Sequence, residues 1–504
     1  MAGLVIIEGE DEQVVNICPQ GTAGEVIDID GLKIQLPLQP EDKDILYSEL
    51  PTAEQYWKRK DLPTALKGIN SMDTWAEQPS SFRKTHSGYI EQEFKRRTEG
   101  LWMYINGTAT FITGNHYFML QWINIDGSFY GDYLAFQRKL FVHQEACKVD
   151  SRSVGQLFVK CRRSGYTNMA VATLLAEGTI ASDKAIGIMS KTGKDAQENI
   201  FMKKAVPMYR KLPFFFKPIQ DGSTNPRMEL AFREPSKKIT KNNKTSVATQ
   251  ALNTVINWKN TVNNAYDGER LYYLFLDEAG KWEKPADVRE AWRINRTCLI
   301  VGRKIVGTAL VGSTVNPLAK GGSQFKHLWA DSNPSERNAN GRTRSMLYRI
   351  FIPSFEALEG FFDKFGNPIV EDPSEPVMAN DGEIISIGAR TYLSNERNAL
   401  KGDANELNEV VRQFPFSPDE AFRDSVTSSL FNLGKIYEQL EYNSMMYPKP
   451  TVQGNFVWKG GVIDSEVQFV PNPEGRWVLA WQPAVDQRNK KTKHRNGHWS
   501  AGNS

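Results

Sequence analysis

The N-terminal quarter of the chain carries a pattern of apolar and polar residues that is typical of strands. Residues 24–34 alternate apolar and polar side chains with a period of two. Further along, Leu101–Ile105 and Thr108–Ile112 flank Asn106-Gly107, a dipeptide that tolerates the positive φ angles of a tight hairpin turn. The pattern therefore predicts a small β-rich extension at the N-terminus and, after it, a β-hairpin.

Between residues 131 and 425 the pattern changes to short apolar runs that alternate with longer helical stretches. The apolar runs are Gln156–Cys161, Ala185–Met189, Leu271–Leu276 and Val306–Val311, and residues 168–179 form one of the helical stretches. A strand that is apolar on both faces is buried on both sides, which is typical of a parallel sheet covered by helices. We therefore predict an α/β fold with a largely parallel central sheet flanked by helices.

The last part of the chain is more polar. After residue 426 we predict a helix and then a strand over Gly475–Trp481, followed by a polar tail over residues 487–495. The pattern divides the chain into a β-rich extension (1–45), a mixed α/β region with the hairpin (46–130), a large α/β domain (131–425) and a C-terminal segment (426–504).

Composition and charge change this picture little. The chain has 504 residues, of which 40% are hydrophobic and 24% charged, so it can bury a large core and form roughly two to three units. Its net charge of +3 is too small to indicate a nucleic-acid binder by itself. The four scattered cysteines predict neither a disulfide framework nor a zinc site. An acidic N-terminus and the lack of a run of about 18 apolar residues predict a protein that is neither secreted nor membrane-spanning.

Candidate chemistry begins with a basic loop that follows the first of the apolar runs and opens a helix. Backbone N–H groups at such a turn can bind phosphate oxygens, a nearby cation can neutralise charge, and a hydroxyl in the first helical turn can reach Mg²⁺. Tyr166 stands where a phosphate-binding loop usually has lysine, so an ordinary basic connection is the alternative interpretation. The predicted nucleotide-binding residues of the loop are Lys160, Cys161, Arg162, Arg163, Ser164, Gly165, Tyr166, Thr167 and Asn168.

A pair of carboxylates, Asp277 and Glu278, follows the apolar run Leu271–Leu276. Nucleotide hydrolysis needs one acid that holds the metal ion and a second that orients the attacking water. A buried strand would bring both acids to the carboxyl edge of the sheet, where ligands of α/β proteins bind. A solvated pair of acids that merely ends a strand is the alternative interpretation.

Two weaker signals flank these motifs. Gly312, Ser313 and Thr314 end the last apolar run, where hydroxyl groups could sense the γ-phosphate; taken alone, the residues favour the alternative interpretation, an ordinary Ser/Thr turn. Gln137 precedes the loop, and its amide could read a donor and an acceptor of adenine, although an exposed helical glutamine is the alternative. The order of glutamine, phosphate loop, acid pair and hydroxyl pair is that of a P-loop NTPase of the additional-strand (ASCE) type.

Together these motifs resemble the large terminase subunit of tailed bacteriophages, a DNA-packaging ATPase. Lys160–Thr167 looks like the deviant Walker A loop of that family, in which the lysine stands at the start of the loop. The roles that the resemblance implies are phosphate binding by Lys160, γ-phosphate sensing or catalysis by Arg162 or Arg163, Mg²⁺ binding by Thr167 and the Walker B acid Asp277, catalysis by Glu278, adenine recognition by Gln137, and coupling by Gly312, Ser313 and Thr314.

A further segment, Arg412–Phe422, is similar to the one that closes the terminase motor domain. Within it Ser417 can cap a helix that Pro418 begins, with Glu420 three residues after the cap. The resemblance covers residues from roughly 130 to 430. It implies that the domain 131–425 is a P-loop ATPase motor.

The C-terminal segment departs from the family pattern. Terminases of this kind usually continue into an RNase H-like nuclease, whose clustered carboxylates hold two divalent metal ions. Here only scattered acids such as Asp464, Glu466 and Asp486 are present. We therefore predict no nuclease site in this chain and expect residues 426–504 to be a linker toward a missing nuclease domain.

The resemblance also implies a function and partners. The function is ATP-driven translocation of double-stranded viral DNA into a procapsid, with ATP and Mg²⁺ as cofactors. The implied partners are double-stranded DNA, the portal protein, the small terminase subunit and further copies of the chain in a homo-oligomeric, pentameric ring, without a membrane. The implied location is the host cell cytoplasm, at the procapsid and not in the mature virion.

A motor that moves any sequence should hold the DNA backbone with cations. The candidates are Lys237, Lys238, Lys241 and Lys244, together with the range Arg337–Arg344, and a solvated loop is the alternative for each. Two other functions are compatible with the sequence: another DNA-dependent ATPase such as a helicase, and a non-catalytic DNA- or capsid-binding protein with an eroded ATPase fold. Tyr166 favours the non-catalytic alternative, whereas the intact pair of Asp277 and Glu278 argues against it.

Overall fold

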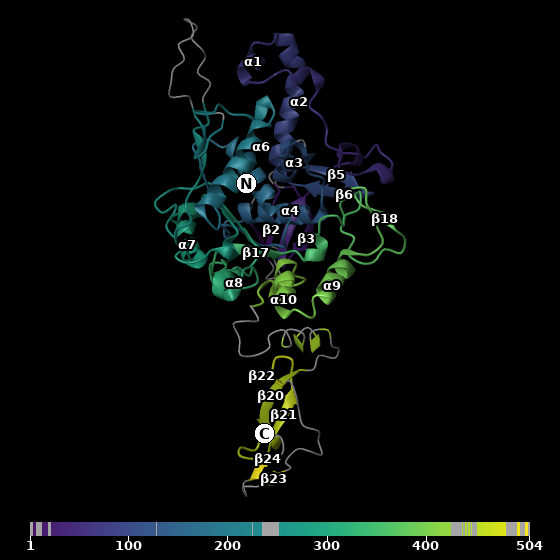
Figure 1. Cartoon of the computed structure of the whole chain (residues 1–504), viewed down its shortest axis with the longest axis vertical. Coiled ribbons are helices and arrows are strands. Elements are labelled where there is room, and N and C mark those ends of the chain that lie inside the picture. Colours follow the sequence, from purple (N-terminus) through teal and green to yellow (C-terminus); the bar gives the residue numbers. More distant parts are fainter. Residues whose placement is uncertain are drawn as a thin grey trace. The chain divides into compact units, whose positions relative to one another are not determined.

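The computed structural model describes residues 4–6, 13–18, 22–127, 129–223, 225–233, 251–424, 451–479, 491–493 and 499–501, with residues 436, 439–440, 442–443 and 445. The chain divides into two compact units, Met1–Ser425 and Val426–Ser504 (Figure 1). Among the described residues, no helix is both long and apolar enough to cross a membrane.

The first unit is built on a seven-stranded sheet. In spatial order its strands are β11 (Glu229–Phe232), β12 (Thr254–Trp258), β10 (Ala185–Met189), β13 (Tyr273–Asp277), β16 (Thr308–Ser313), β9 (Gly155–Val159) and β17 (Leu347–Phe351). All neighbours pair in parallel except β11 and β12. The predicted α/β fold with a largely parallel sheet is therefore confirmed. Strand β16 lies between β9 and β13, which is the strand arrangement of an ASCE-type P-loop NTPase.

The strands are apolar throughout because helices cover both faces of the sheet. Along β13, Tyr273 and Phe275 belong to one hydrophobic core, whereas Leu274 and Leu276 belong to a second core on the opposite face. The helices that contribute to the first core include α3 (Gly114–Trp122), α4 (Ala135–Val149) and α5 (Tyr166–Gly178), and those of the second include α7 (Val288–Asn295) and α8 (Gly322–Ala330).

The N-terminal extension is a four-stranded sheet whose buried side chains join the first core. Its strands, in spatial order, are β1 (Leu4–Ile6), β2 (Gln13–Asn16), β4 (Leu32–Pro37) and β3 (Ala23–Ile29). In β4 every second side chain is buried, as the alternation predicts. The predicted hairpin is also confirmed, with β5 (Leu101–Ile105) and β6 (Thr108–Ile112) joined by Asn106 and Gly107 at φ angles of 46° and 79°.

The first unit also contains further α-helices and strands and one π-helix. They are α1 (Met72–Ala76), α2 (Ser80–Glu99), β7 (Asn124–Asp126), β8 (Phe129–Tyr130), the π-helix Asp195–Ala205, α6 (Val206–Arg210), β14 (Ile300–Val301), β15 (Lys304–Ile305), β18 (Val377–Met378), β19 (Ile384–Ile385), α9 (Ala389–Ala399), α10 (Ala404–Gln413) and α11 (Pro418–Ala421). The predicted helix start at Ser417 is confirmed, because its hydroxyl accepts the backbone N–H of Glu420 at 3.4 Å.

Several predicted boundaries are wrong by about two residues. The strand predicted over Val306–Val311 runs over Thr308–Ser313, because the N–H groups of Val306 and Gly307 bond to the carbonyl of Leu299 outside the sheet. The strand predicted over Leu271–Leu276 runs over Tyr273–Asp277, since the Leu271 N–H bonds to Cys298.

The second unit contains an antiparallel sheet in the order β21 (Val467–Pro471), β20 (Val452–Trp458) and β22 (Trp477–Leu479), and a strand pair β23 (Lys491–Lys493) and β24 (Trp499–Ala501). Within the predicted strand Gly475–Trp481, β22 covers residues 477–479, and residues 480 and 481 lie outside the described part. The same holds for most of the helix predicted after residue 426.

Candidate functional site

The carboxyl ends of four parallel strands meet at one edge of the central sheet. Asp277 in β13 is in register with Gly312 in β16, and Ser313 is in register with Val159 in β9. The residues that directly follow β9, β10, β13 and β16 are Lys160, Ser190, Glu278 and Thr314. Since all four strands run in the same direction, these side chains gather at this edge.

The loop between β9 and α5 turns sharply because two of its residues have left-handed backbones. Arg163 has a φ of 63° and Gly165 a φ of 73°, and α5 begins at Tyr166, directly after this glycine. The helix was predicted to begin at Asn168, so it starts two residues earlier than expected. Gly165 to Asn168 all line a cavity, which places the helix N-terminus, with its partial positive charge, at the cavity wall.

Tyr166 occupies a packing position rather than a ligand position. Its side chain is only 3% exposed, its ring packs against Phe158 with centroids 5.1 Å apart, and its hydroxyl donates to Oε1 of Gln156 at 3.2 Å. A Cβ atom added to Gly312 would lie 2.2 Å from the Tyr166 ring. A lysine at position 166 would therefore bury its ammonium group between β9 and β16, away from a ligand. In this chain the lysine stands at the start of the loop instead, at position 160.

We expect Gly312→Ala to lower the free energy of unfolding by about 1–3 kcal/mol, the usual cost of overpacking a core. The added methyl group must displace the Tyr166 ring and with it the first turn of α5. Urea unfolding at neutral pH measures the effect. Gly68→Ala is the matched control, since a Cβ there would meet nothing within 4 Å. Equal stability of Gly312→Ala and the control would contradict the tight packing of this ring.

A buried ammonium group lies between the two predicted acids. Lys160 Nζ is 3.3 Å from Oδ1 of Asp277 and 2.9 Å from Oε1 of Glu278, and Lys160 is 6% exposed. The second oxygen of Glu278 accepts the hydroxyl of Thr314 at 3.3 Å and pairs with Lys281 Nζ at 2.9 Å. Glu278 is thus held by three groups, two of them cationic.

Asp277 is held by hydroxyl groups from two further elements. Thr167 Oγ1, in the first turn of α5, donates to Oδ1 at 3.1 Å, and Ser190 Oγ, after β10, donates to Oδ2 at 3.3 Å. The four predicted residues Lys160, Thr167, Asp277 and Glu278 therefore form one continuous polar cluster.

The electrostatics keep Glu278 and Lys160 ionised at neutral pH. Burial alone would raise the pKa of Glu278, but the charges of Lys160 and Lys281 outweigh it and lower this pKa to about 2. Burial would lower the pKa of Lys160, but attraction to Asp277 and Glu278 raises it instead. The backbone of Glu278 has a φ of 50°, a strained conformation for a residue other than glycine, and such strain is concentrated at functional sites.

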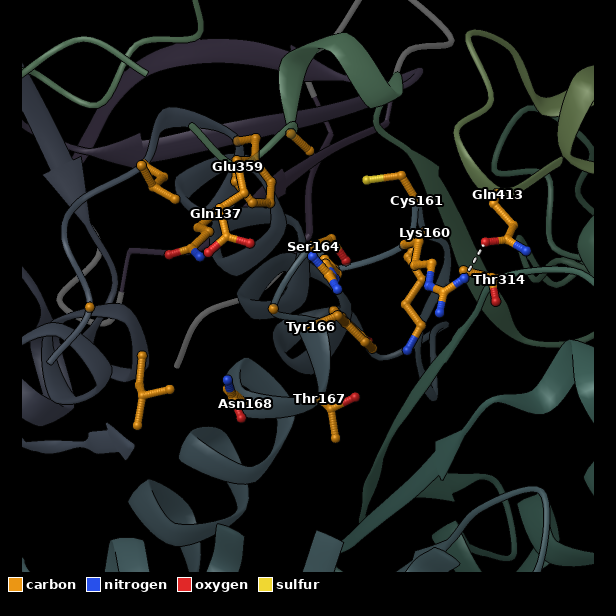
Figure 2. A pocket seen from close by; sticks show the side chains of 18 of the residues that line it. Gln137, Lys160, Cys161, Ser164, Tyr166, Thr167, Asn168, Thr314, Glu359 and Gln413 are labelled. Atoms are coloured by element: carbon orange, nitrogen blue, oxygen red, sulfur yellow. Dashed lines mark hydrogen bonds between the residues drawn. The ribbon is translucent and has the colours of Figure 1, made fainter. Parts of the chain in front are cut away.

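A cavity of about 940 Å³ opens at this edge of the sheet. Among its lining residues are Gln137, all residues from Lys160 to Asn168, Glu278 and Thr314. Figure 2 shows Gln137 and Glu359 on one side of the loop, with Lys160, Thr314 and Gln413 on the other. Gln137 and the cluster around Lys160 therefore lie in different parts of one cavity.

Two of the predicted coupling residues do not line this cavity. Ser313 is fully buried and its hydroxyl donates to the carbonyl of Thr314, while Gly312 lies against Tyr166. Only Thr314 of the three lines the cavity and touches Glu278.

The part of the cavity around Gln137 contains a buried acceptor without a partner in the described part of the chain. Gln137 is 7% exposed, and its Oε1 has no hydrogen bond there; the same is true of the buried hydroxyl of Ser164. Leaving such a group unsatisfied costs about 1–3 kcal/mol. A ligand that offers N–H donors to Gln137, such as an adenine, would relieve this cost.

The structure separates the two predicted arginines. The Arg162 guanidinium donates to Oε1 of Gln413 at 2.7 Å, at the end of α10. Both arginines are exposed, but the Arg163 side chain has no partner among the described residues. The arginine that is available to a ligand without breaking a contact is therefore Arg163.

Sequence reasoning missed Ser190, Lys281, Glu359 and Gln413. Ser190 follows the predicted strand Ala185–Met189, so the rule that identified Asp277 and Glu278 could have found it. Lys281 stands three residues after Glu278, which is a usable signal for an ion pair. Glu359 lies in a segment that no local pattern marks. Gln413 belongs to the segment Arg412–Phe422 that the sequence analysis singled out, but nothing in that segment indicates a contact with the loop.

Of the two segments predicted to contact DNA, the structure describes only the second. Lys237, Lys238, Lys241 and Lys244 lie outside the described residues. In the second candidate range, Arg337 is engaged within the fold, because its guanidinium donates to the carbonyl of Gly341 at 3.2 Å and to the Tyr348 hydroxyl at 2.9 Å.

Comparisons with known proteins find weak structural likenesses only. No protein-family model and no curated protein matches the sequence. The large terminase ATPase domain of Thermus phage P74-26 is 15% identical over 40% of this chain and 76% of that chain, with a TM-score of 0.29. The large terminase of bacteriophage HK97 is 10% identical over 76% of this chain and 65% of that chain, with a TM-score of 0.33. A large terminase of a thermophilic bacteriophage in complex with ADP is 14% identical over 40% of each chain, with a TM-score of 0.25.

Proposed function

We propose that this chain is a Mg²⁺-dependent ATPase and the motor part of a DNA-packaging terminase. The observation that carries the ATPase proposal is the cluster of Lys160, Thr167, Asp277 and Glu278 beside the N-terminus of α5 at the cavity wall. Phosphoryl transfer to water requires a cation that binds the phosphates, a hydroxyl and a carboxylate that bind the metal ion, and a second carboxylate that orients the water.

The residues present fit both ATP and Mg²⁺. The cavity volume lies within the usual range of about 300–1,000 Å³ for small-molecule sites, and the unpartnered Oε1 of Gln137 suits a nucleobase donor. The hydroxyl of Thr167 and the carboxylate of Asp277 are hard oxygen donors only 3.1 Å apart. Mg²⁺ commonly takes one or two such protein ligands, with phosphate and water completing its shell. When bound, Mg²⁺ would offset the charge of the β- and γ-phosphates.

The neighbouring side chains then have distinct roles. Glu278 orients and polarises the attacking water, and Thr314 holds the Glu278 carboxylate in position. In the described state Lys160 weakens Glu278 as a base by lowering its pKa. When the phosphates attract Lys160, Glu278 loses one cationic partner and its pKa rises, so the base becomes effective only beside a bound triphosphate.

The DNA-packaging part of the proposal is supported by the order and form of the motifs. The lysine at the start of the loop, the arginines within it and the closing segment Arg412–Phe422 are features in which this sequence resembles large terminase subunits. The proposed partners are double-stranded DNA, the portal protein, the small terminase subunit and further copies of the chain in a pentameric ring. The proposed place of action is the host cytoplasm at the procapsid.

Mg²⁺-dependent ATP hydrolysis, measured with and without double-stranded DNA, tests the proposal. We expect turnover that EDTA abolishes and that double-stranded DNA increases. Strand displacement on a forked duplex would favour a helicase instead. A folded protein that neither binds nor hydrolyses ATP would support the non-catalytic alternative.

We expect Thr167→Val to raise the Mg²⁺ concentration needed for half-maximal turnover by about tenfold or more, because valine keeps the shape of threonine but offers no metal ligand. The measurement is a Mg²⁺ titration at saturating ATP. Thr85→Val is the matched control, since the Thr85 hydroxyl bonds only to the carbonyl of Ser81 within α2. An unchanged Mg²⁺ requirement would remove Thr167 from the metal site.

A further inference from the structure

We propose that Gln413 is a positioning residue that forms a latch with Arg162, and that binding of a nucleoside triphosphate opens this latch and loosens the end of α10. The proposal rests on the proposed nucleotide site. It assigns to Arg162 and Gln413 a role that the motif order does not supply.

The latch consists of two hydrogen bonds between the phosphate loop and α10. The backbone N–H of Arg162 donates to the carbonyl of Gln413 at 2.9 Å. The Arg162 guanidinium donates to Oε1 of Gln413 at 2.7 Å, and this bond is the dashed line at Gln413 in Figure 2. The Gln413 amide in turn donates from Nε2 to Oε1 of Glu409 at 2.6 Å, one helical turn earlier. Both ends of this amide are therefore engaged, which fixes its orientation.

A row of alternating charges links the latch to the catalytic carboxylate. Glu278 pairs with Lys281, and Lys281 acts electrostatically on Glu409, which holds Gln413. Glu409, Gln413, Arg162, Lys281 and Glu278 all line the same cavity. The latch and the catalytic carboxylate therefore border the same cavity, so we expect a charge bound at its phosphate end to act on Arg162 and, more weakly, on Glu409.

A triphosphate is a stronger partner for Arg162 than Gln413 is. Gln413 offers a neutral acceptor, whereas phosphate oxygens are anionic and fit the fork of the guanidinium group. The guanidinium donor is charged in both contacts, so the phosphate contact is the stronger one because its acceptor is charged as well. Since Arg162 lines the cavity, its guanidinium can exchange one partner for the other. The exchange leaves α10 attached to the loop by the backbone bond alone.

Thermodynamic linkage gives the latch a signature that a merely structural contact lacks. If ATP binding must break the side-chain bond, removing that bond beforehand makes binding tighter. The bond between Arg162 and Gln413 joins a charged donor to a neutral acceptor and is exposed to solvent, so its contribution is modest and Gln413→Met should lower the Kd for ATP by about 2- to 10-fold. Gln413→Glu would turn the bond into an ion pair with Arg162 and should raise the Kd instead.

The test measures the Kd of a non-hydrolysable ATP analogue with Mg²⁺ and, in parallel, amide hydrogen exchange over Ala404–Gln413. The variants are Gln413→Met, Gln413→Glu and, as control, Glu406→Met on the exposed side of α10. In the unmodified protein and the control, the analogue should speed exchange at the end of α10. In Gln413→Met exchange should already be fast and insensitive to the analogue.

The outcomes separate the latch from the nucleotide site. Opposite shifts of the Kd in the methionine and glutamate variants would support the latch, even if one variant lost some stability. If the unmodified protein binds the analogue but both variants weaken binding, or if exchange in α10 ignores the analogue, the latch is wrong. If the unmodified protein binds no analogue at all, the proposed ATP site itself fails.

Discussion

Glu278→Gln is expected to lower the rate of ATP hydrolysis by about 10²- to 10⁴-fold, the usual contribution of a general base, while ATP still binds. Glutamine keeps the shape of the side chain and can still accept the Thr314 hydroxyl, which lies 3.3 Å from Glu278 Oε2. It cannot take a proton from water. The change also frees Lys160 from its closer partner, 2.9 Å away, so the affinity for ATP should stay equal or rise.

Single-turnover hydrolysis and equilibrium binding of ATP, measured on the same preparation, separate these two effects. Glu283→Gln is a suitable control, because Glu283 is an exposed glutamate five residues along the same segment. A variant that hydrolyses ATP at the unmodified rate would show that another group activates water. Loss of binding together with loss of turnover would mean that Glu278 supports the site structurally.

The residues that parallel strands deliver could be predicted from the sequence. Asp277, Glu278 and Lys160 each follow an apolar run, and the carboxyl ends of parallel strands share one edge of a sheet. Thr167 could be predicted because it opens the helix after the loop. For these residues, a local pattern together with one general rule of α/β folds was enough to locate them.

The partners and directions of the same side chains could not be predicted. Nothing in the sequence indicates that Lys160 pairs with both Asp277 and Glu278. These contacts depend on the distance between β9 and β13, which the intervening strand β16 sets. The sequence predicts that the Ser313 hydroxyl faces the nucleotide. In the structure Ser313 is buried at the end of β16, and its hydroxyl donates to the carbonyl of Thr314. Gln413 reaches the loop only through tertiary packing of α10.

Lys160→Met is expected to lower the free energy of unfolding by about 3 kcal/mol at neutral pH and to weaken ATP binding. Removing one partner of a buried ion pair leaves the other charge uncompensated, at a cost of about 3–5 kcal/mol. The lower end of this range applies because Glu278 keeps Lys281 as a partner and its side chain is 21% exposed. Methionine nearly matches the volume of lysine, so the effect reports the lost charge.

The pH dependence of this difference identifies its cause. The folded-state pKa of Glu278 lies near 2, below the ordinary 4.5, so its ionisation stabilises the fold above pH 4.5 and this stabilisation is lost as the pH falls toward 2. In Lys160→Met the folded-state pKa of Glu278 rises. The deficit in stability should therefore be largest between pH 5 and 9 and should shrink below about pH 4.5.

A double-mutant cycle completes the test. Adding Glu278→Gln to Lys160→Met removes the uncompensated charge and should recover part of the lost stability, whereas additive losses would show that the two residues do not interact. Lys281→Met is the matched control, because it removes the other cation at Glu278 from a position that is 32% exposed and should cost less. ATP binding distinguishes the two lysines further: Lys160 is proposed to serve the phosphates directly, so only its loss should weaken binding at every pH where the protein is folded.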